Sequence, residues 1–176
     1  YPYFMRTVVL GPPPPELEAL IARRRQSGLD KYDEVWDGDY HMAPMAHSSH
    51  GRIQAQVMHL LMQWADPAGL VVTGPFNLGE PGNFRVPDAA VHRVDPDAVW
   101  VPTAALVVEV VSPDDETWEK LPFYAARQVD EVLVVECEQD LVRWLRRDGD
   151  WFAPADCSAL LGPGSAALSD MISWPG

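Results

Sequence analysis

The sequence has little positive charge, and this limits how the protein can bind an anionic partner. Its 176 residues include 13 Lys and Arg against 26 Asp and Glu, a formal net charge of −13, and only Lys31 and Lys120 are lysines. Nucleic-acid binding is driven by basic side chains that displace phosphate counterions. A nucleic-acid partner would therefore need a local basic groove or bound divalent cations, and the acidity also suits a small-molecule or protein partner.

Several other features are missing. No stretch approaches 18 consecutive apolar residues, so we expect no membrane span. The N-terminus shows no charged segment followed by an apolar one, so we expect no signal peptide and a cytoplasmic protein. Cys137 and Cys157 match no metal-ligand spacing, and we interpret them as reduced bystanders. The sequence also has no glycine-rich phosphate loop and no Gly-x-Ser-x-Gly motif.

The length and the 47% hydrophobic content predict one domain with one sizeable core over residues 1–176. Residues 1–15, which end in a stiff proline run, are interpreted as a lead-in. We expect residues 162–176 to be rich in loops.

The residue pattern predicts a mixed α/β fold with a central sheet flanked by helices. Helices are predicted over residues 16–25, 49–65 and 117–127. Strands are predicted over residues 32–36, 39–42, 70–73, 84–92, 105–111, 131–137 and 141–147, with an added edge at 151–152. Asp37-Gly38 and Asp148-Gly149 predict hairpin turns. Ser48 or Ser49 is available to cap the second helix, and Pro122 falls in the first turns of the third.

Two carboxylates are candidates for a metal site. Glu109 is the only charge in the apolar strand at 105–111, and a buried carboxylate needs a partner, a proton or a metal. It could instead reach solvent at the strand end or pair with an arginine. Asp88 follows Pro87, which interrupts a strand, so its side chain can point into a cleft; alternatively it is a capping or turn aspartate.

Carboxylates from two neighbouring strands, together with a backbone carbonyl, suit Mg²⁺ or Mn²⁺. Such an ion polarises a phosphodiester and acidifies a bound water. Lys120, on the helix after the Glu109 strand, could supply the positive charge that stabilises the transition state. Tyr124 is four residues further along the same helical face and could steer it. The alternative for Lys120 is an ordinary surface lysine.

His50 is a secondary candidate, because it shares a helical face with Ile53 and Val57. It could bind a substrate phosphate or organise the metal ligands, or it could be a structural histidine.

The motifs resemble those of the Uma family of restriction-endonuclease-like proteins over about residues 31–147. The resemblance is carried by Val-Pro-Asp at 86–88, Glu-Val-Val-Ser-Pro at 109–113, Lys120 with Tyr124, and the apolar strand at 131–135. It implies a PD-(D/E)xK core with a Mg²⁺-dependent phosphodiesterase site. Asp88 and Glu109 would be the acidic metal ligands, and the Val110 carbonyl would be the third.

Two positions depart from the family pattern. Val111 stands where the usual lysine would be, two residues after the glutamate, and Lys120 matches a lysine that has migrated to the next helix. Thr117 stands where an acidic residue often precedes that lysine. The resemblance also suggests Glu34 as an additional acid from an upstream element, with a solvated strand glutamate as the alternative.

We therefore expect a Mg²⁺-dependent endodeoxyribonuclease acting on DNA. The alternatives are a non-catalytic relative that serves as a binding or assembly module, and a hydrolase of small phosphate esters. A homodimer is a candidate assembly, since two-fold oligomers are the commonest kind and cutting two strands needs two sites. Arginines at 23–25, 143, 146 and 147 could flank a DNA groove, whereas the acidic run at 114–116 would repel phosphate.

Overall fold

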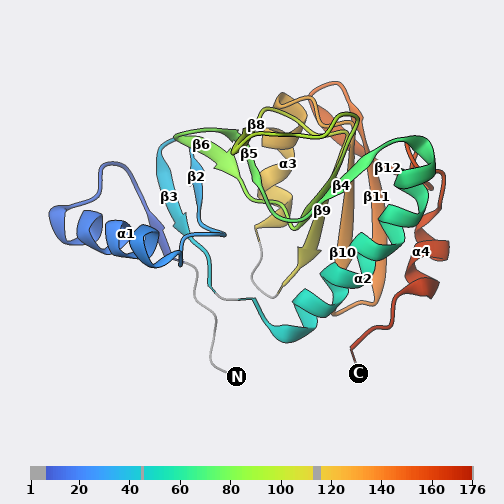
Figure 1. Ribbon diagram of the computed structural model, residues 1–176, viewed down its shortest axis with the longest axis horizontal. Coiled ribbons are helices and arrows are strands. Elements are labelled where there is room, and N and C mark those ends of the chain that lie inside the picture. Colours follow the sequence, from blue (N-terminus) through green and yellow to red (C-terminus); the bar gives the residue numbers. More distant parts are fainter. Residues whose placement is uncertain (1–6, 45, 113–115, 176) are drawn as a thin grey trace.

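The computed structural model describes residues 7–44, 46–112 and 116–175, which form two six-stranded sheets with helices packed on them (Figure 1). The helices are α1 (Pro15–Ser27), α2 (Ser48–Ala65), α3 (Thr117–Ala126) and α4 (Ser165–Met171), with a short 3-10 turn at Asp66–Ala68. The first sheet contains, in spatial order, β1 (Thr7–Val9), β3 (Asp39–Met42), β2 (Glu34–Trp36), β6 (Asn83–Arg85), β5 (Asn77–Glu80) and β8 (Trp100–Val101). The second contains β12 (Trp151–Ala155), β11 (Leu141–Asp148), β10 (Glu131–Glu136), β9 (Leu106–Val111), β7 (Ala89–His92) and β4 (Val71–Thr73).

The second sheet is the central one, and helices cover both of its faces. β9 pairs with β10 in parallel and with β7 in antiparallel orientation, so the sheet is mixed. Alternate residues of β9 point to opposite faces. Val108 and Val110 pack with α2 and α4, whereas Val107 packs with α3. This double coverage explains the nearly continuous apolar sequence of β9 and β10, and it confirms the predicted mixed sheet flanked by helices.

Helix α2 buries one apolar stripe against the central sheet. Its buried residues recur at helical spacing: Ile53, Val57, Leu60, Leu61 and Ala65. The predicted serine cap is wrong. His47 is the N-cap residue, and its Nδ1 accepts a hydrogen bond from the amide of Ser49, so an imidazole nitrogen fills the place of a serine oxygen. Within residues 7–44, 46–112 and 116–175, no helix has both the length and the apolar character needed to cross a membrane.

The predicted strand at 84–92 is two strands in different sheets. β6 ends at Arg85 and belongs to the first sheet, whereas β7 begins at Ala89 in the central sheet. Pro87 lies between them, and proline cannot donate to a sheet ladder. The chain therefore crosses from one sheet to the other immediately before Asp88.

Other predicted elements also need correction. Pro122 lies inside α3 rather than in its first turn, so the hydrogen bond it would donate to the carbonyl of Trp118 is lost. Packing of Leu121 against the sheet holds the helix in spite of this loss. The C-terminal segment contains α4, whose Leu168 is buried in the core. Three short strands were not predicted: β1 within the lead-in, β5 and β8.

A buried polar cluster attaches α1 to the hairpin of β2 and β3. Asp33, 2% exposed, accepts hydrogen bonds from Arg24 Nε at 2.8 Å and Nη2 at 2.6 Å. The hydroxyl of Tyr40 and the amide of Ala43 also donate to it, each at 2.8 Å. Burial, followed by the bond to Asp33, raises the pKa of Tyr40. Because every donor converges on one carboxylate, Asp33 fixes the hairpin against α1.

We predict that Asp33→Ala destabilises the protein by about 3–5 kcal/mol, because it removes the carboxylate that pairs with the Arg24 guanidinium and accepts from two other donors. Urea unfolding followed by circular dichroism measures the change. Asp97→Ala, at an exposed aspartate, is the control and should change the free energy of unfolding by less than about 0.5 kcal/mol. Equal effects of the two substitutions would contradict this role of Asp33.

Candidate active site

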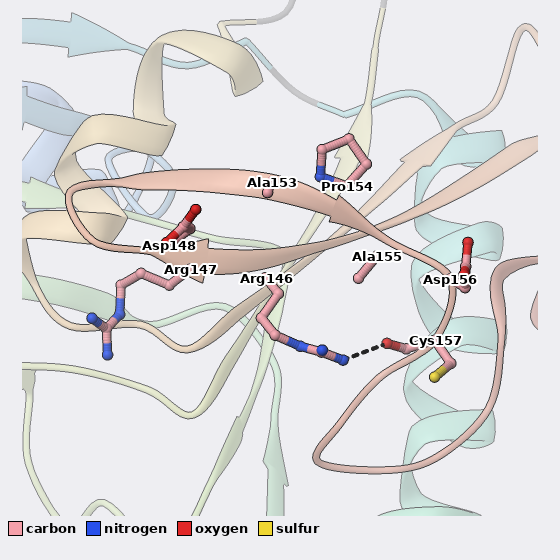
Figure 2. A pocket seen from close by; sticks show the side chains of 8 residues that line it. All are labelled: Arg146, Arg147, Asp148, Ala153, Pro154, Ala155, Asp156 and Cys157. Atoms are coloured by element: carbon pink, nitrogen blue, oxygen red, sulfur yellow. Dashed lines mark hydrogen bonds between the residues drawn. The ribbon is translucent and has the colours of Figure 1, made fainter.

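A surface hollow and a buried carboxylate cluster lie in different parts of the molecule. The hollow follows the hairpin of β11 and β12, with Arg146, Arg147 and Cys157 in its lining (Figure 2). Both arginines are paired, Arg146 with Glu131 at 3.6 Å and Arg147 with Asp130 at 3.2 Å. Because its cations are neutralised, the hollow is a weaker candidate than the cluster around Glu109.

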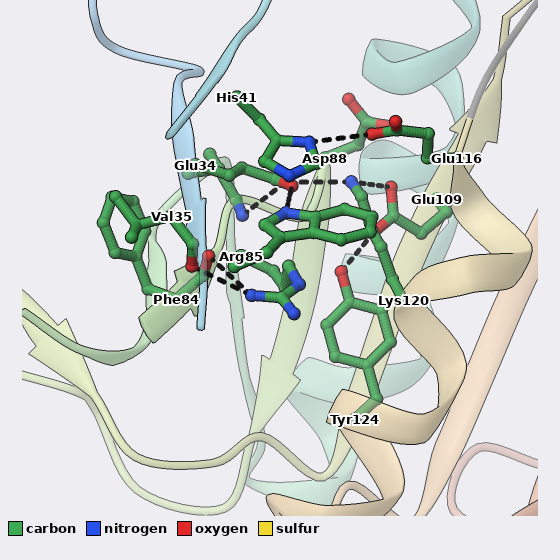
Figure 3. Close-up of polar contacts among 12 residues, drawn as sticks. Glu34, Val35, His41, Phe84, Arg85, Asp88, Glu109, Glu116, Lys120 and Tyr124 are labelled. Carbon is green, nitrogen blue, oxygen red and sulfur yellow. Dashed lines mark hydrogen bonds and ion pairs between the residues drawn. The ribbon is translucent and has the colours of Figure 1, made fainter. Parts of the chain in front are cut away.

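Lys120 joins two buried glutamates that come from different sheets (Figure 3). Its Nζ lies 3.2 Å and 3.3 Å from the two carboxylate oxygens of Glu109 on β9. The same nitrogen lies 2.9 Å from Oε1 of Glu34 on β2. Lys120 is 4% exposed, Glu109 3% and Glu34 1%. Lys120 is thus not a surface lysine, and Glu34 is not a solvated strand glutamate.

The carboxylate of Glu34 is held by the chain on both sides. Its Oε1 accepts a hydrogen bond from the amide of Val86 at 2.8 Å, and its Oε2 accepts one from the indole of Trp36 at 2.6 Å. A carboxylate accepts several hydrogen bonds in its plane. Glu34 therefore has a fixed orientation toward Lys120, which explains how it can be buried.

Tyr124 completes the contacts to Glu109 that come from α3. Its hydroxyl donates to Oε1 of Glu109, and the side chain is fully buried in the core under α3. Burial, followed by the negative charges of Glu109 and Glu34, raises the pKa of Tyr124 well above its usual value. Tyr124 is therefore a hydrogen-bond donor at neutral pH. Since Lys120 and Tyr124 are four residues apart, α3 presents both to one carboxylate.

Asp88 lies one residue before β7, and it already makes hydrogen bonds to β9. Its amide donates to the carbonyl of Val108 at 3.1 Å, and its Oδ2 accepts from the amide of Val110 at 2.7 Å. Its own carbonyl accepts from Gln54 at 2.6 Å. The side chain of Asp88 thus contacts the residue that follows Glu109, and both carboxylates are anchored at the same end of β9.

His50 approaches the Asp88 carboxylate from α2. Its Nε2 lies 2.7 Å from Oδ1 of Asp88, and its Nδ1 lies 3.0 Å from the hydroxyl of Ser112. It therefore makes polar contacts rather than packing in the apolar core. An imidazole that donates to a carboxylate through one nitrogen has its tautomer set by that bond. His50 thereby limits the rotation of the Asp88 side chain.

Sequence reasoning missed several residues of this region. Arg85 is a buried charge on β6, whose sequence Asn-Phe-Arg gives no sign that the arginine is buried. His41 stacks on Trp36 and lies 3.2 Å from Glu116, a pairing between segments 75 residues apart that no local pattern indicates. Gln54 could have been found, because it is one helical turn after His50.

Some predicted features lie elsewhere. Among the arginines proposed to flank a groove, Arg24 pairs with Asp33 and Arg143 with Glu136, so these charges are already neutralised. Asp114 and Asp115 fall outside the described residues. The amide of Val110 is bonded to Asp88, while the role of its carbonyl stays a prediction.

The donor chemistry of the cluster fits a hard divalent cation. Within the described ranges, no group of three or more His, Cys, Asp and Glu side chains could hold a metal ion. A site for Mg²⁺ or Mn²⁺ needs fewer protein ligands, because these ions keep several waters. Each carboxylate oxygen has about two lone pairs, so accepting a hydrogen bond does not by itself prevent such an oxygen from binding a cation. Two carboxylates and a carbonyl without thiolates favour Mg²⁺ or Mn²⁺ over Zn²⁺.

The chain has detectable relatives. A family model described as "Putative restriction endonuclease" (Uma2) matches residues 15–168, beyond the predicted core on both sides. Among solved structures, it is similar to a protein from Anabaena variabilis described as a "putative nuclease belonging to DUF820", with 13% sequence identity and a TM-score of 0.65. The match covers 79% of this chain and 90% of that one, and at such identity it confirms the predicted fold alone. No curated protein sequence matches the chain.

We predict that Cys137 reacts slowly with iodoacetamide, although both cysteines are free. Burial, followed by the charge of nearby Asp88, raises the pKa of Cys137 to about 11. At pH 8 only about one thiol in a thousand is then ionised, and this fraction rises about tenfold per pH unit. The rate is measured by mass spectrometry in Cys157→Ser, and Asp88→Asn should increase it. Equal rates at pH 8 in Cys157→Ser and Cys137→Ser, which retains the exposed Cys157, would contradict the assignment.

Proposed function

Because the chain belongs to the Uma2 family of putative restriction endonucleases, we propose that it is a metal-dependent endodeoxyribonuclease that hydrolyses phosphodiester bonds in DNA. The main support is one arrangement: Asp88 and Glu109 at the same end of β9, with the ammonium of Lys120 on the second carboxylate. These are the groups that phosphodiester hydrolysis requires, namely oxygen ligands and a cation. A cytoplasmic homodimer is the form we propose for it.

In this proposal Asp88, Glu109 and the carbonyl of Val110 hold Mg²⁺ or Mn²⁺. The bound ion would polarise a phosphate oxygen and lower the pKa of a water. The remaining residues orient these ligands. His50 and the amide of Val110 fix the two oxygens of Asp88, and Tyr124 fixes Glu109. Loss of contacts that orient metal ligands typically lowers metal affinity by about 10–100-fold.

Lys120 has the role of the family's lysine, which Val111 cannot perform. Its ammonium carries three donor hydrogens, and the contacts to Glu34 and Glu109 hold it beside the metal ligands. From there it can donate to a phosphate oxygen and stabilise the negative charge that develops during attack. Glu34 acts as the additional acid, and its part is to hold the lysine rather than the metal.

The charge of the cluster bears on how substrate binds. Glu34, Asp88 and Glu109 outnumber Lys120 and Arg85, and the whole chain has a net charge of −13. A DNA phosphate is therefore repelled until a divalent cation is present. We infer that the metal binds first and the nucleic acid second.

We predict that Asp88→Asn and Glu109→Gln weaken Mn²⁺ binding by at least about 10–100-fold and reduce cleavage by about 10³-fold. Calorimetry measures binding, and cleavage of supercoiled plasmid and labelled oligonucleotides measures activity. Glu131→Gln is the matched control, since Glu131 is a buried carboxylate on β10, paired with Leu106 at the other end of β9. It should leave metal affinity unchanged.

Each outcome of that experiment separates the candidate functions. Cleavage of DNA that survives in both variants would refute the assignment of the ligands. Metal binding with hydrolysis of bis(p-nitrophenyl) phosphate but not of DNA would favour a small phosphate-ester hydrolase. Absence of binding by either ion to the wild type would favour a binding or assembly module.

We predict that Lys120→Met lowers kcat by about 10²–10³-fold, because one cation is removed from the developing charge. Metal binding should persist, since Lys120 is not a ligand. Lys31→Met is the control, at the only other lysine of the chain and on an exposed segment. Full activity of folded Lys120→Met, with folding checked by circular dichroism, would exclude the lysine from catalysis.

A further inference from the structure

The guanidinium of Arg85 lies in the middle of a stacked column outside the proposed reacting groups. Its Cζ is 4.2 Å from the ring centroid of Trp36 and 4.1 Å from that of Phe123. His41 stacks on Trp36 with a centroid distance of 4.2 Å and an interplanar angle of 17°, and Arg127 lies 5.1 Å from Phe123. Two groups at such distances cannot share one face of a ring, so both faces of Trp36 are covered.

The guanidinium of Arg85 is positioned by stacking on aromatic rings more than by its hydrogen bonds. The side chain is 4% exposed, and its Nη1 donates to the carbonyls of Val35 and Phe84 and to the Asn83 side chain at 3.0–3.2 Å. Its buried Nε has no hydrogen-bond partner in the described part of the chain. A buried donor without an acceptor is unfavourable, so stacking on two rings must compensate for it.

The column leads directly to Lys120. The indole of Trp36 donates to Oε2 of Glu34 at 2.6 Å, and Oε1 of Glu34 lies 2.9 Å from the Lys120 nitrogen. Phe123, at the other side of Arg85, is three residues after Lys120 on α3. The contacts therefore form a closed circuit, which runs from Lys120 on α3 through Glu34, Trp36 and Arg85 to Phe123 on the same helix. Figure 3 shows Arg85 below the carboxylates that hold Lys120.

We propose that Arg85 is a positioning residue for Lys120, which acts through the ring of Trp36 and the carboxylate of Glu34. The flat guanidinium keeps the indole at a fixed distance from α3, and the indole N–H then holds Glu34 where it meets the lysine. A lysine at position 85 would keep the charge but could not stack in this way. The part that Lys120 plays in hydrolysis rests on the proposed function, whereas its positioning by Arg85 does not.

The experiment uses the fact that the chain has two lysines. The full-length protein is labelled with ¹³C and ¹⁵N in lysine alone, and its side-chain signals are recorded by NMR at one pH without metal. Lys31 is exposed and gives the reference for a solvated ammonium, whereas Lys120 is buried and its ammonium protons should exchange slowly. The readout does not depend on nuclease activity, so it separates this inference from the proposed function.

In Arg85→Lys the Lys120 signals should shift toward those of Lys31, and its ammonium protons should exchange faster. In a Glu34→Gln background the same substitution should produce no further shift, because the path through Glu34 is already broken. Arg127→Lys is the matched control. Its guanidinium also contacts Phe123, but it pairs with Glu80 rather than with the circuit, so Lys120 should be unaffected.

Unchanged Lys120 signals in folded Arg85→Lys would overturn the proposal. An equal shift in the Glu34→Gln background would also overturn it, because the effect would then bypass Glu34. If Arg85→Lys does not fold, Trp36→Phe decides. That variant keeps an aromatic ring beside Arg85 and removes only the N–H donor, so a shift of Lys120 supports the proposal and the absence of one refutes it.

Discussion

The arrangement of this molecule depends on one buried cation held between two buried acids. Three charged side chains are removed from water around Lys120, and this is tolerable only when each charge is paired and hydrogen-bonded. The two acids come from different sheets, Glu34 from β2 and Glu109 from β9. Pairing them through one ammonium therefore fixes how the first sheet meets the central sheet. Trp36 and Val86 donate further hydrogen bonds to Glu34, and Tyr124 donates one to Glu109.

β7 begins at Ala89, one residue after Asp88, and this late start provides the second half of the site. Pro87 prevents regular pairing, and Asp88 replaces the missing ladder bond with its own carboxylate. Its other oxygen is then directed toward His50 on α2. The end of β9 thus receives polar groups from both covered faces of the sheet, Lys120 and Tyr124 from α3 and His50 from α2. This end of β9 is therefore polar, whereas the residues on either side of the strand belong to apolar clusters.

The fold and several candidate site residues could be predicted from the sequence because their signals are local. Glu109 is a lone charge in an apolar strand, and Lys120 is one of only two lysines. The periodicity of α2 and the Asp-Gly turns are also local. Arg85 and Trp36 could not be linked, since Val35 of β2 pairs with Phe84 of β6 49 positions later. Strands of two to four residues such as β1, β5 and β8 carry too little alternation to predict. The N-cap at His47 could not be predicted, because Ser, Thr, Asp, Asn and Gly are the residues preferred at this position.

The origin of Glu34 in the first sheet has a consequence for how the protein opens. If the hairpin of β2 and β3 separates from the central sheet, Lys120 loses one acid and Glu34 loses its cation in the same event. A partly opened chain would leave charges without their partners in a region still shielded from water, which is unfavourable. Local unfolding at this boundary should therefore be rare and coupled to wider opening. The hairpin and α1 are thus not a removable attachment, and the central sheet alone would be a scaffold whose lysine has lost its fixed direction.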